Sequence, residues 1–444
     1  MIFTQFVDDA LGCASYLVGD PGTGDAVVVD PAFAIEQYLE EAERRDVRIV
    51  RVVETHTHAD HLSGHGRLAL EHAIPVSIHP AADAEYPHDA LEDGAEVVLG
   101  DIVLRCIHTP GHRPEHCCLA VTDRTRGDDP WIVLTGDSLF VGDAARPDLA
   151  VEAREGSEGL FHSLRRLLEL GDGVEVYPGH VAGSLCGKGM SSKASTTIGF
   201  ERKFNAALAH DDVALFVAES TGISTPRPPN MERIVELNKG PFIGAQPEPT
   251  ELHEPPVGPQ ILDVRPIEAF AAGHHPGALS VPVSGTRFST KAAFVLDRGP
   301  VAVVAADDHE VARATRGLWS VGQLDIAGYV LGGGTESLEL VRIEQLDALL
   351  EAGAELIDVR EKDERDSGYI AGSRNIPYRL LALGEADLPR DRKIVTICEV
   401  GPRAAIAASI LAARGFDAHP VVNGGIDAWM AAGKPTVEFR RCGS

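Results

Sequence analysis

The sequence predicts a multidomain α/β protein, for three reasons. The first half alternates short apolar runs, rich in Val, Ile and Leu, with segments of helical periodicity. A proline-rich stretch, Gln246 to Pro259, then interrupts every periodic pattern. Beyond it, the chain repeats one pattern of roughly 90 residues. A chain of 444 residues is long enough for two to four domains, each with a core of its own.

In the first half, we expect five apolar runs to form buried strands that end in polar residues. These runs are DAVVVDP (25–31), VRIVRVVETH (47–56), IVLRCIHTPGH (102–112), WIVLTGD (131–137) and GVEVYPGH (173–180). Helical periodicity follows in AIEQYLEEAERR (34–45) and GLFHSLRRLLELG (159–171). The alternation predicts an α/β domain over residues 1–243, in which the ends of rigid strands present site residues.

An extended linker is predicted at 244–258, because Gln246 to Pro259 contains five prolines and several acidic residues without periodicity. After it, ILDVRPIEAFAAGHHPGALSVPV aligns with LIDVREKDERDSGYIAGSRNIPY at a constant offset of 95 residues, which matches Asp263 to Asp358. Further along, YVLGGGTESL in the first segment corresponds to PVVNGGIDAW in the second. We therefore predict two copies of one parallel-sheet domain with helices on both faces, at 259–338 and 339–444.

The composition excludes several classes of partner. The net charge is −27, with 40 Lys+Arg against 67 Asp+Glu, which argues against nucleic acid and anionic membranes as partners. No apolar run approaches the roughly 20 residues of a membrane span. The opening MIFTQFVDDA has no basic, apolar leader pattern, so we expect a cytoplasmic protein.

The seven cysteines show no paired spacing, and we expect them to be reduced. Cys106, Cys117 and Cys118 lie in apolar runs that are typical of a core.

The stretch ETHTHADHLSGH (54–65) carries the strongest chemical signal. Neutral imidazole and carboxylate are ligands of zinc and of first-row transition metals, and a His-x-His-x-Asp-His run concentrates both. Three later strands also end on such a residue. The candidate ligands are His56, His58, Asp60, His61, His112, Asp137 and His180. Four strands that finish on a possible ligand predict a metal centre at one edge of the scaffold.

A second candidate site is the loop Cys398-Glu399-Val400-Gly401-Pro402-Arg403, which lies between the apolar strand IVTI and an alanine-rich helix. A thiolate at Cys398 is favoured by loop N–H groups, by the positive end of the helix and by the charge of Arg403. The same groups suit a persulfide sulfur or an oxyanion. The first copy has PVAVVAADDHEVARATRGLWSVG at the corresponding place and no cysteine anywhere.

The loop, with LIDVR before it and NGGIDAW after it, resembles the rhodanese family of sulfurtransferases, in which the cysteine carries a sulfane sulfur as Cys–S–SH. By this resemblance Cys398 is the nucleophile, Arg403 assists it, and residues 399–402 bind the persulfide or oxyanion. The first copy resembles a rhodanese domain without its nucleophile, and we expect a structural or docking role for it.

Residues 1–243 resemble the metallo-β-lactamase fold, an αββα sandwich, through THTHADH, HTPGH, TGD and YPGH. TGDSLFVGDAARPDL, YPGHVAGSLCGK and STTIGFERKFNAAL further resemble persulfide dioxygenases, and the whole chain resembles their CstB-type fusions with one inactive and one active rhodanese domain. The resemblance implies one Fe(II) per chain, held by His56, His112 and Asp137, a two-His, one-carboxylate set suited to iron and O₂. It makes His58, Asp60, His61 and His180 supporting groups that orient the ligands, although a dinuclear site remains open.

The function implied is oxidation of a low-molecular-weight persulfide by O₂ to sulfite and thiol in sulfide detoxification. Cys398 then forms or uses thiosulfate, and relatives of this architecture suggest a homo-oligomer. Cys186, six residues after His180, is equally open as a contributor to the metal cavity or as a buried packing residue. Two alternatives share these residues: a thioesterase of the glyoxalase II type with two zinc ions, and a non-catalytic sulfur carrier or sensor.

Overall fold

The computed structural model describes residues 1–8, 10–147, 152–181, 191, 193–221, 227–384 and 387–438. The chain divides into two compact units, of which the first comprises Met1–Gln246 with Trp319–Gly322 and the second Pro247–Leu318 with Gln323–Ser444. Within the described ranges, no helix is both long and apolar enough to cross a membrane.

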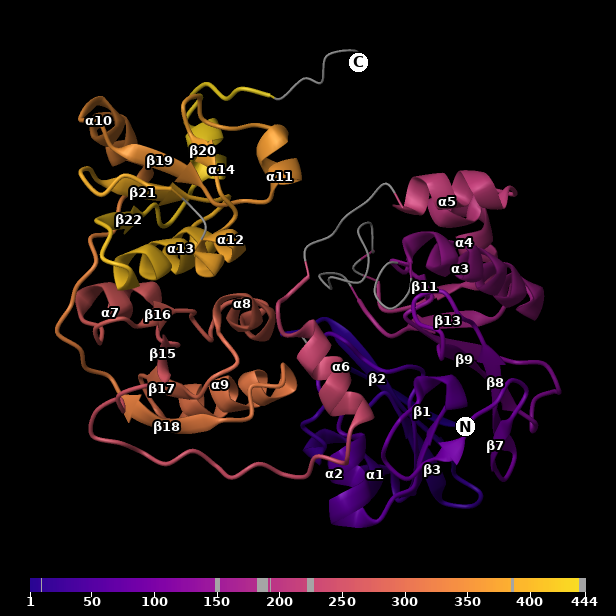
Figure 1. The fold of residues 1–444 in the computed structure, drawn as a ribbon. Coiled ribbons are helices and arrows are strands. Elements are labelled where there is room, and N and C mark those ends of the chain that lie inside the picture. The colour runs from indigo at the N-terminus through magenta and orange to yellow at the C-terminus, as the bar shows by residue number, and fades with distance from the viewer. Residues whose placement is uncertain are drawn as a thin grey trace. The chain divides into compact units, whose positions relative to one another are not determined.

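The first unit is built on two six-stranded sheets (Figure 1). The strands of the first sheet lie in chain order: β1 (Ile2–Asp8), β2 (Cys13–Asp20), β3 (Asp25–Val29), β4 (Arg48–Val53), β5 (Val76–Ile78) and β6 (Asp89–Ala90). β1, β2 and β3 pair antiparallel, whereas β3 to β6 are parallel. Because β2 runs against β3, the residue that begins β2 lies at the edge where β3 and β4 end.

The second sheet has the order β14-β13-β10-β9-β8-β7. Its strands are β7 (Glu96–Leu99), β8 (Ile102–His108), β9 (Cys117–Asp123), β10 (Ile132–Gly136), β13 (Glu175–Pro178) and β14 (Thr196–Thr197). Only β10 and β13 pair in parallel within it; the other neighbours are antiparallel. A short hairpin, β11 (Leu139–Phe140) with β12 (Asp143–Ala144), follows β10.

Alternation of side chains along the strands makes this unit a four-layer αββα sandwich. On β3, Val27 packs into the core between the sheets and Val28 into the core on the outer face. On β9, Cys117 lies between the sheets, and Cys118 belongs to the outer core that also contains Leu160. The helices are α1 (Glu36–Arg45), α2 (His65–His72), α3 (Ala153–Leu167), α4 (Ile198–Phe204), α5 (Val213–Thr221) and α6 (Met231–Lys239). The expected burial of Cys106, Cys117 and Cys118 is confirmed.

The second unit contains two four-stranded parallel sheets with the same strand order, β16-β15-β17-β18 and β20-β19-β21-β22. The first sheet consists of β15 (Gln260–Asp263), β16 (Leu279–Ser280), β17 (Val301–Ala305) and β18 (Ile326–Leu331), with helices α7 (Ile267–Ala272), α8 (Phe288–Val295) and α9 (Asp308–Ser320). The second consists of β19 (Glu355–Asp358), β20 (Arg374–Asn375), β21 (Ile394–Ile397) and β22 (Ala418–Pro420).

Helices α10 (Leu346–Glu351), α11 (Lys362–Asp366), α12 (Tyr378–Leu383), α13 (Pro402–Ala413) and α14 (Ile426–Ala431) accompany the second sheet. The internal repeat predicted from the sequence is visible in one buried ion pair. Arg265 binds Asp263 at 2.6 Å and the carbonyl of Gly273 at 2.8 Å. Arg360 binds Asp358 at 2.7 Å and the carbonyl of Gly368 at 2.7 Å. The 95-residue offset therefore reproduces the same local geometry twice.

The predicted fold class, an αββα sandwich followed by parallel α/β structure, is confirmed. Part of the stretch predicted as linker is ordered against a strand. The N–H of Leu252 donates to the carbonyl of Tyr329 at 2.7 Å, and the N–H of Tyr329 donates to the carbonyl of Thr250 at 3.0 Å. These contacts extend the first parallel sheet beyond β18.

Candidate functional site

The ends of four strands bring the predicted ligands of the first unit together. His56 follows β4, His112 follows β8, Asp137 follows β10 and His180 follows β13, and all four side chains are buried. Parallel strands of one sheet end at the same edge, and the sandwich places the two edges side by side. The predicted convergence at strand ends is therefore present in the structure.

Three of these side chains direct their ligand atoms at one another. Nε2 of His56 lies 3.9 Å from Oδ2 of Asp137, and Nε2 of His112 lies 3.5 Å from the same oxygen. One ligand atom of each of the three residues falls within a common span of 4.8 Å. Among the described residues, Oδ2 of Asp137 is buried without any hydrogen-bond partner.

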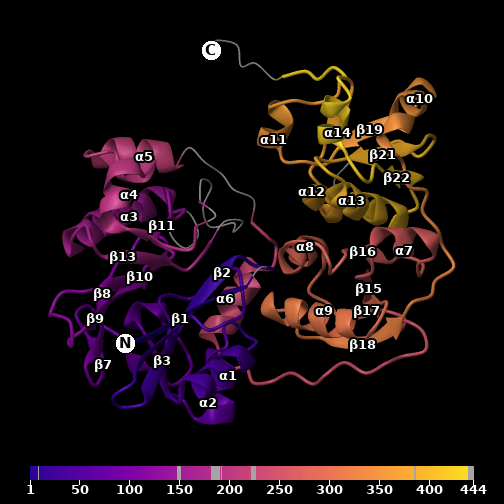
Figure 2. The same cartoon turned by 180° about the vertical axis from the view of Figure 1, so that it is seen from behind.

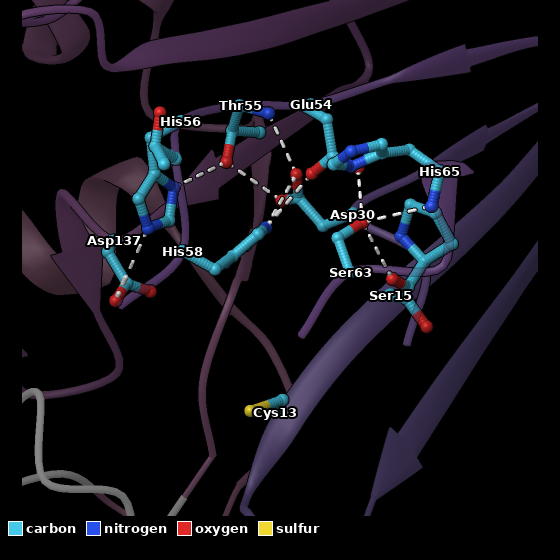
Figure 3. A network of polar contacts seen from close by, with 12 residues as sticks. Cys13, Ser15, Asp30, Glu54, Thr55, His56, His58, Ser63, His65 and Asp137 are labelled. Atoms are coloured by element: carbon cyan, nitrogen blue, oxygen red, sulfur yellow. Dashed lines mark hydrogen bonds and ion pairs between the residues drawn. The ribbon is translucent and has the colours of Figure 1, made fainter. Parts of the chain in front are cut away.

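The proton on His56 is placed by a chain of contacts that ends on Asp30 (Figure 3). Thr55 donates its backbone N–H to Oδ1 of Asp30 at 2.7 Å and its hydroxyl to Oδ2 at 2.8 Å. Because the single hydroxyl proton is used there, Thr55 Oγ1 accepts at 2.9 Å from Nδ1 of His56. His56 therefore carries its proton on Nδ1 and presents the lone pair of Nε2 to Asp137.

His112 is set in the same tautomer by the backbone. Its Nδ1 lies 3.2 Å from the carbonyl oxygen of Arg146, which only accepts, so Nδ1 carries the proton and Nε2 the lone pair. Two imidazole lone pairs and one carboxylate oxygen then face each other with no proton between them. A cation is what satisfies three such buried acceptors, and the donor set matches a two-His, one-carboxylate metal site.

The pKa values agree with this assignment. Burial, followed by the charges of His58 and His112, lowers the pKa of His56 well below its usual range. Burial also lowers the pKa of His112, although the charge of Asp137 opposes this. Burial raises the pKa of Asp137, but the charge and hydrogen bond of His180 outweigh it and the net shift is downward. Both imidazoles are therefore neutral and the carboxylate is ionised near neutral pH, which is the state that binds a metal.

His116, which the sequence did not single out, orients the carboxylate ligand. The backbone N–H of Asp137 donates at 2.9 Å to Nε2 of His116, so the proton of this ring is on Nδ1, 2.9 Å from Oγ1 of Thr109. Burial and the charge of His112 lower the pKa of His116 to about 3, which keeps the ring neutral and its Nε2 an acceptor. His116 is thus a positioning residue for Asp137.

His180 is bound between two carboxylates. Its Nδ1 lies 2.6 Å from Oδ1 of Asp137 and its Nε2 lies 2.7 Å from Oδ2 of Asp60. Burial raises the pKa of Asp60, but the charges of His180 and His61 outweigh burial, and the net shift is well downward. Asp60 is therefore ionised, like Asp137. His180 therefore bridges Asp137 and Asp60, with a carboxylate oxygen against each ring nitrogen.

His58 and His61 also have partners other than the first three ligands. Nε2 of His58 lies 3.1 Å from Oε2 of Glu54 and 3.3 Å from Oδ1 of Asp30. These carboxylates outweigh burial, which acts in the opposite direction, and raise the pKa of His58 well above its usual range. Nδ1 of His61 lies 3.1 Å from Oδ1 of Asp60. The four supporting residues are therefore engaged mainly with carboxylates.

Cys13 is a further site residue that the sequence did not reveal. Its Sγ lies 3.3 Å from each of three atoms: Oδ2 of Asp60, Nδ1 of His61 and Nε2 of His180. Cys13 begins β2 and forms an isolated bridge with His180, so strand direction brings it to the site. Cys186 lies outside the described residues.

The sulfur-transfer loop begins directly after β21. Cys398 is buried, and its Sγ accepts a hydrogen bond of 3.1 Å from the N–H of Gly401. Gly401 has φ +126°, a backbone conformation that a side chain would strain, and Pro402 follows at the first position of α13. The loop therefore directs an N–H group at the sulfur, as a thiolate or persulfide requires.

Backbone hydrogen bonds from the NGGIDAW segment hold the start of the loop in place. The N–H of Ile426 donates to the carbonyl of Cys398 at 2.9 Å, and the N–H of Asp427 donates to the carbonyl of Glu399 at 3.2 Å. A Cβ on Gly425 would come within 2.2 Å of the carbonyl oxygen of Cys398, so only glycine permits this approach. These hydrogen bonds fix the backbone of Cys398 and Glu399, and the loop then turns so that the N–H of Gly401 points at the sulfur.

Arg403 has a different immediate partner from the one expected. Its guanidinium binds Glu364 through two hydrogen bonds of 2.6 and 2.7 Å, and lies 3.5 Å from the carboxylate of Glu399. Burial lowers the pKa of Arg403, but Glu364 more than offsets this and the net shift is upward. Much of its charge is thereby balanced, and its direct action on Cys398 stays a prediction.

Comparison with known families matches two segments of the chain. The metallo-beta-lactamase superfamily matches residues 8–180 and the rhodanese-like domain matches residues 342–432. An uncharacterized protein of Mycobacterium tuberculosis, Rv2581c, is 32% identical over 47% of this chain and 98% of its own length. A cytoplasmic hydroxyacylglutathione hydrolase of Arabidopsis thaliana is 35% identical over 37% of this chain and 62% of its own length.

One solved structure extends beyond the first unit. A metallo-beta-lactamase from Staphylococcus aureus subsp. aureus COL is 29% identical, with a TM-score of 0.69, and the match covers 75% of this chain and 99% of the other. The match therefore includes residues that follow the αββα sandwich.

Proposed function

Since the chain belongs to the metallo-beta-lactamase superfamily and carries a rhodanese-like domain near its C-terminus, we propose that it is a persulfide dioxygenase coupled to a sulfurtransferase. The substrate is a low-molecular-weight thiol persulfide, and the overall reaction is RSSH + O₂ + H₂O → RSH + SO₃²⁻ + 2H⁺. One Fe(II) per chain is the proposed cofactor.

The single observation that carries this proposal is the contrast between two sets of ligands. His56, His112 and Asp137 present three unprotonated atoms to one point, and Oδ2 of Asp137 has no other partner among the described residues. In His180, by contrast, each ring nitrogen already lies within hydrogen-bond distance of a carboxylate oxygen, at 2.6 Å from Asp137 and 2.7 Å from Asp60. A three-residue site that leaves coordination positions open for substrate and O₂ is typical of non-haem iron oxygenases.

Bound Fe(II) would supply the O₂ and electron-transfer chemistry that protein side chains lack. The chain's own residues orient the ligands through Thr55 and His116, and keep both imidazoles neutral by burial. His180 links Asp137 to Asp60, whose side chain is 15% exposed. The two protons released by the reaction can leave along this path, from a buried carboxylate to a partly exposed one.

The second rhodanese-like copy would transfer sulfane sulfur at Cys398. Sulfite attacks the outer sulfur of the Cys398 persulfide: Cys398–S–S⁻ + SO₃²⁻ → Cys398–S⁻ + S₂O₃²⁻. The S–S bond of the persulfide breaks, its electron pair leaves on the Cys398 thiolate, and a new S–S bond forms in thiosulfate. The N–H of Gly401, 3.1 Å from Sγ, stabilises the departing thiolate.

A metal-exchange experiment tests this function. Protein freed of metal and reloaded with either Fe(II) or Zn(II) is assayed for oxygen uptake with glutathione persulfide and for hydrolysis of S-lactoylglutathione. The proposal predicts persulfide-dependent oxygen uptake with iron only, at about one iron per chain for full activity. Rapid thioester hydrolysis by the zinc form, without oxygen uptake by the iron form, would contradict it.

A dinuclear zinc thioesterase is the second candidate, and specific observations favour it. Cys13, Asp60 and His61 also bring one ligand atom each within 4.8 Å. Nδ1 of His58 is buried and has no hydrogen-bond partner among the described residues. The similarity to a hydroxyacylglutathione hydrolase is consistent with this candidate as well.

A further inference from the structure

A cavity of about 250 Å³ lies over the sulfur-transfer loop and has walls from both rhodanese-like copies. The active copy contributes residues of the loop itself, Val400, Gly401 and Pro402. The copy without a cysteine contributes Lys291 of α8 and Glu268 of α7. The cavity beside the loop is therefore formed jointly by the loop and by the copy that has no nucleophile.

The two copies are packed together at this place by buried groups. Helix α13, which follows the loop, lies between β16 of the first copy and the strands β21 and β22 of its own copy (Figures 1 and 2). The backbone N–H of Ser280 in β16 donates to Oγ of Ser409 in α13 at 2.9 Å, and both side chains are fully buried. Phe294 of α8 makes an edge contact with Tyr378, with ring centroids 6.1 Å apart. This packing sets the position of α8 relative to the loop.

Of the described residues that line this cavity, Lys291 is the one cationic residue and Glu268 is the one carboxylate. The Nζ of Lys291 donates to the carbonyl oxygen of Thr286 at 2.7 Å, and among the described residues it forms no ion pair with a carboxylate. Burial and the charges of Arg287 and Arg403 lower the pKa of Lys291, whereas a thiolate at Cys398 acts to raise it. Lys291 therefore lies in the wall of a cavity that Gly401, the hydrogen-bond donor to the sulfur, also lines, and it is close enough to Cys398 for the two charges to interact.

We propose that Lys291 of the copy without a nucleophile binds the inorganic sulfur oxyanion that exchanges sulfur with Cys398. This inference rests on the proposed sulfurtransferase function and assigns its oxyanion subsite. It gives the first copy a role in the reaction: the copy supplies the charge that recognises sulfite or thiosulfate, while the second supplies the sulfur carrier. Lys291 thereby lowers the repulsion between a dianion and an anionic persulfide during attack.

Two variants of the full chain test the charge, and a third serves as a control. Lys291→Met removes the charge and keeps most of the length of the side chain, and Lys291→Arg keeps the charge. Lys393 precedes β21, at the opposite end of this strand from Cys398, and pairs with Glu339 on the surface, so Lys393→Met is the matched control. Thiosulfate:cyanide sulfurtransferase kinetics should show KM for thiosulfate raised about tenfold in Lys291→Met. The arginine variant should restore most of the affinity, and the control should match wild type.

A second measurement does not depend on sulfurtransferase activity. The rates at which iodoacetate, an anion, and iodoacetamide, a neutral reagent, alkylate Cys398 are followed by peptide mass spectrometry. The rate with iodoacetate divided by the rate with iodoacetamide should fall several-fold in Lys291→Met and return towards wild type in Lys291→Arg. The same ratio should be unchanged in Lys393→Met. Equal ratios in wild type and Lys291→Met would overturn the assignment of Lys291. Absence of sulfurtransferase activity in wild type, with the ratio still dependent on Lys291, would instead overturn the proposed function of the second copy.

Discussion

The hydroxyl oxygen of Thr55 lies 2.9 Å from Nδ1 of His56, and this contact places the proton of the imidazole. The hydroxyl proton itself is donated to Asp30 at 2.8 Å, so the ring must donate to Thr55. A ligand held in the correct tautomer loses less free energy on binding a metal than one that must first exchange its proton. Asp30 and Thr55 therefore fix the proton of His56 on Nδ1, which leaves Nε2 free to bind the metal.

Thr55→Val should weaken metal binding without unfolding the protein. It deletes the acceptor for Nδ1 of His56 and the hydroxyl that donates to Asp30, whereas the backbone N–H still donates to Asp30. We expect the metal affinity to fall about 10- to 100-fold. Thr57→Val is the matched control, because Oγ1 of Thr57 is buried and has no hydrogen-bond partner among the described residues. Competition with a metal indicator measures the affinities, and equal values for the two variants would refute the role given to Thr55.

Replacing a ligand should have a larger effect than replacing Thr55. We expect His56→Ala, His112→Ala and Asp137→Ala each to lose bound iron and persulfide-dependent oxygen uptake together. His79→Ala is a suitable control, since His79 stacks on His108 away from the three ligands. Elemental analysis of the purified variants gives the metal content. Full iron content in any of the three ligand variants would remove that residue from the proposed site.

The ion pair between Arg403 and Glu364 should make part of the stability pH-dependent. Burial raises the pKa of Glu364, but Arg403 outweighs it and the folded-state pKa is lowered. The stabilisation is therefore present above the unfolded-state pKa and is lost as pH falls through the lower folded-state value. The side chain of Glu364 is 37% exposed, so solvent screening limits the gain to about 1 kcal/mol or less.

Denaturant unfolding of wild type and Glu364→Gln at several pH values measures this contribution. The variant should be less stable near pH 7, and the difference should disappear once the glutamate of wild type is protonated in strongly acidic solution. A difference that is independent of pH would mean that the carboxylate charge of Glu364 is not responsible.

The residues that lie at the ends of strands could be predicted from the sequence alone. His56, His112 and Asp137 each follow an apolar run, and the carboxyl ends of strands converge without knowledge of packing detail. The 95-residue offset was equally sufficient for the repeat, because Asp263 and Asp358 make the same ion pair.

Residues whose role depends on strand direction or tertiary packing could not be found in this way. Cys13 lies at the site because β2 runs antiparallel to β3. The apolar pattern of the sequence does not predict the direction in which a strand runs. Asp30 directly follows β3, so the strand-end rule applied to it, but a single aspartate after a strand is too common to stand out. The bond from the N–H of Asp137 to His116 and the contact of Arg403 with Glu364 join segments distant in sequence, and only the folded chain shows them.

Coupling of the two chemistries gives the most direct test of the account. Oxygen uptake, sulfite and thiosulfate are followed from the earliest time points with glutathione persulfide, in wild type, Cys398→Ser and Asp137→Ala. Early times matter because free sulfite and persulfide also form thiosulfate without the enzyme. We predict that wild type consumes oxygen and forms mainly thiosulfate, that Cys398→Ser consumes oxygen at a similar rate but accumulates sulfite, and that Asp137→Ala consumes none. No oxygen uptake by the iron-loaded wild type, or the same early ratio of sulfite to thiosulfate in wild type and Cys398→Ser, would contradict the account.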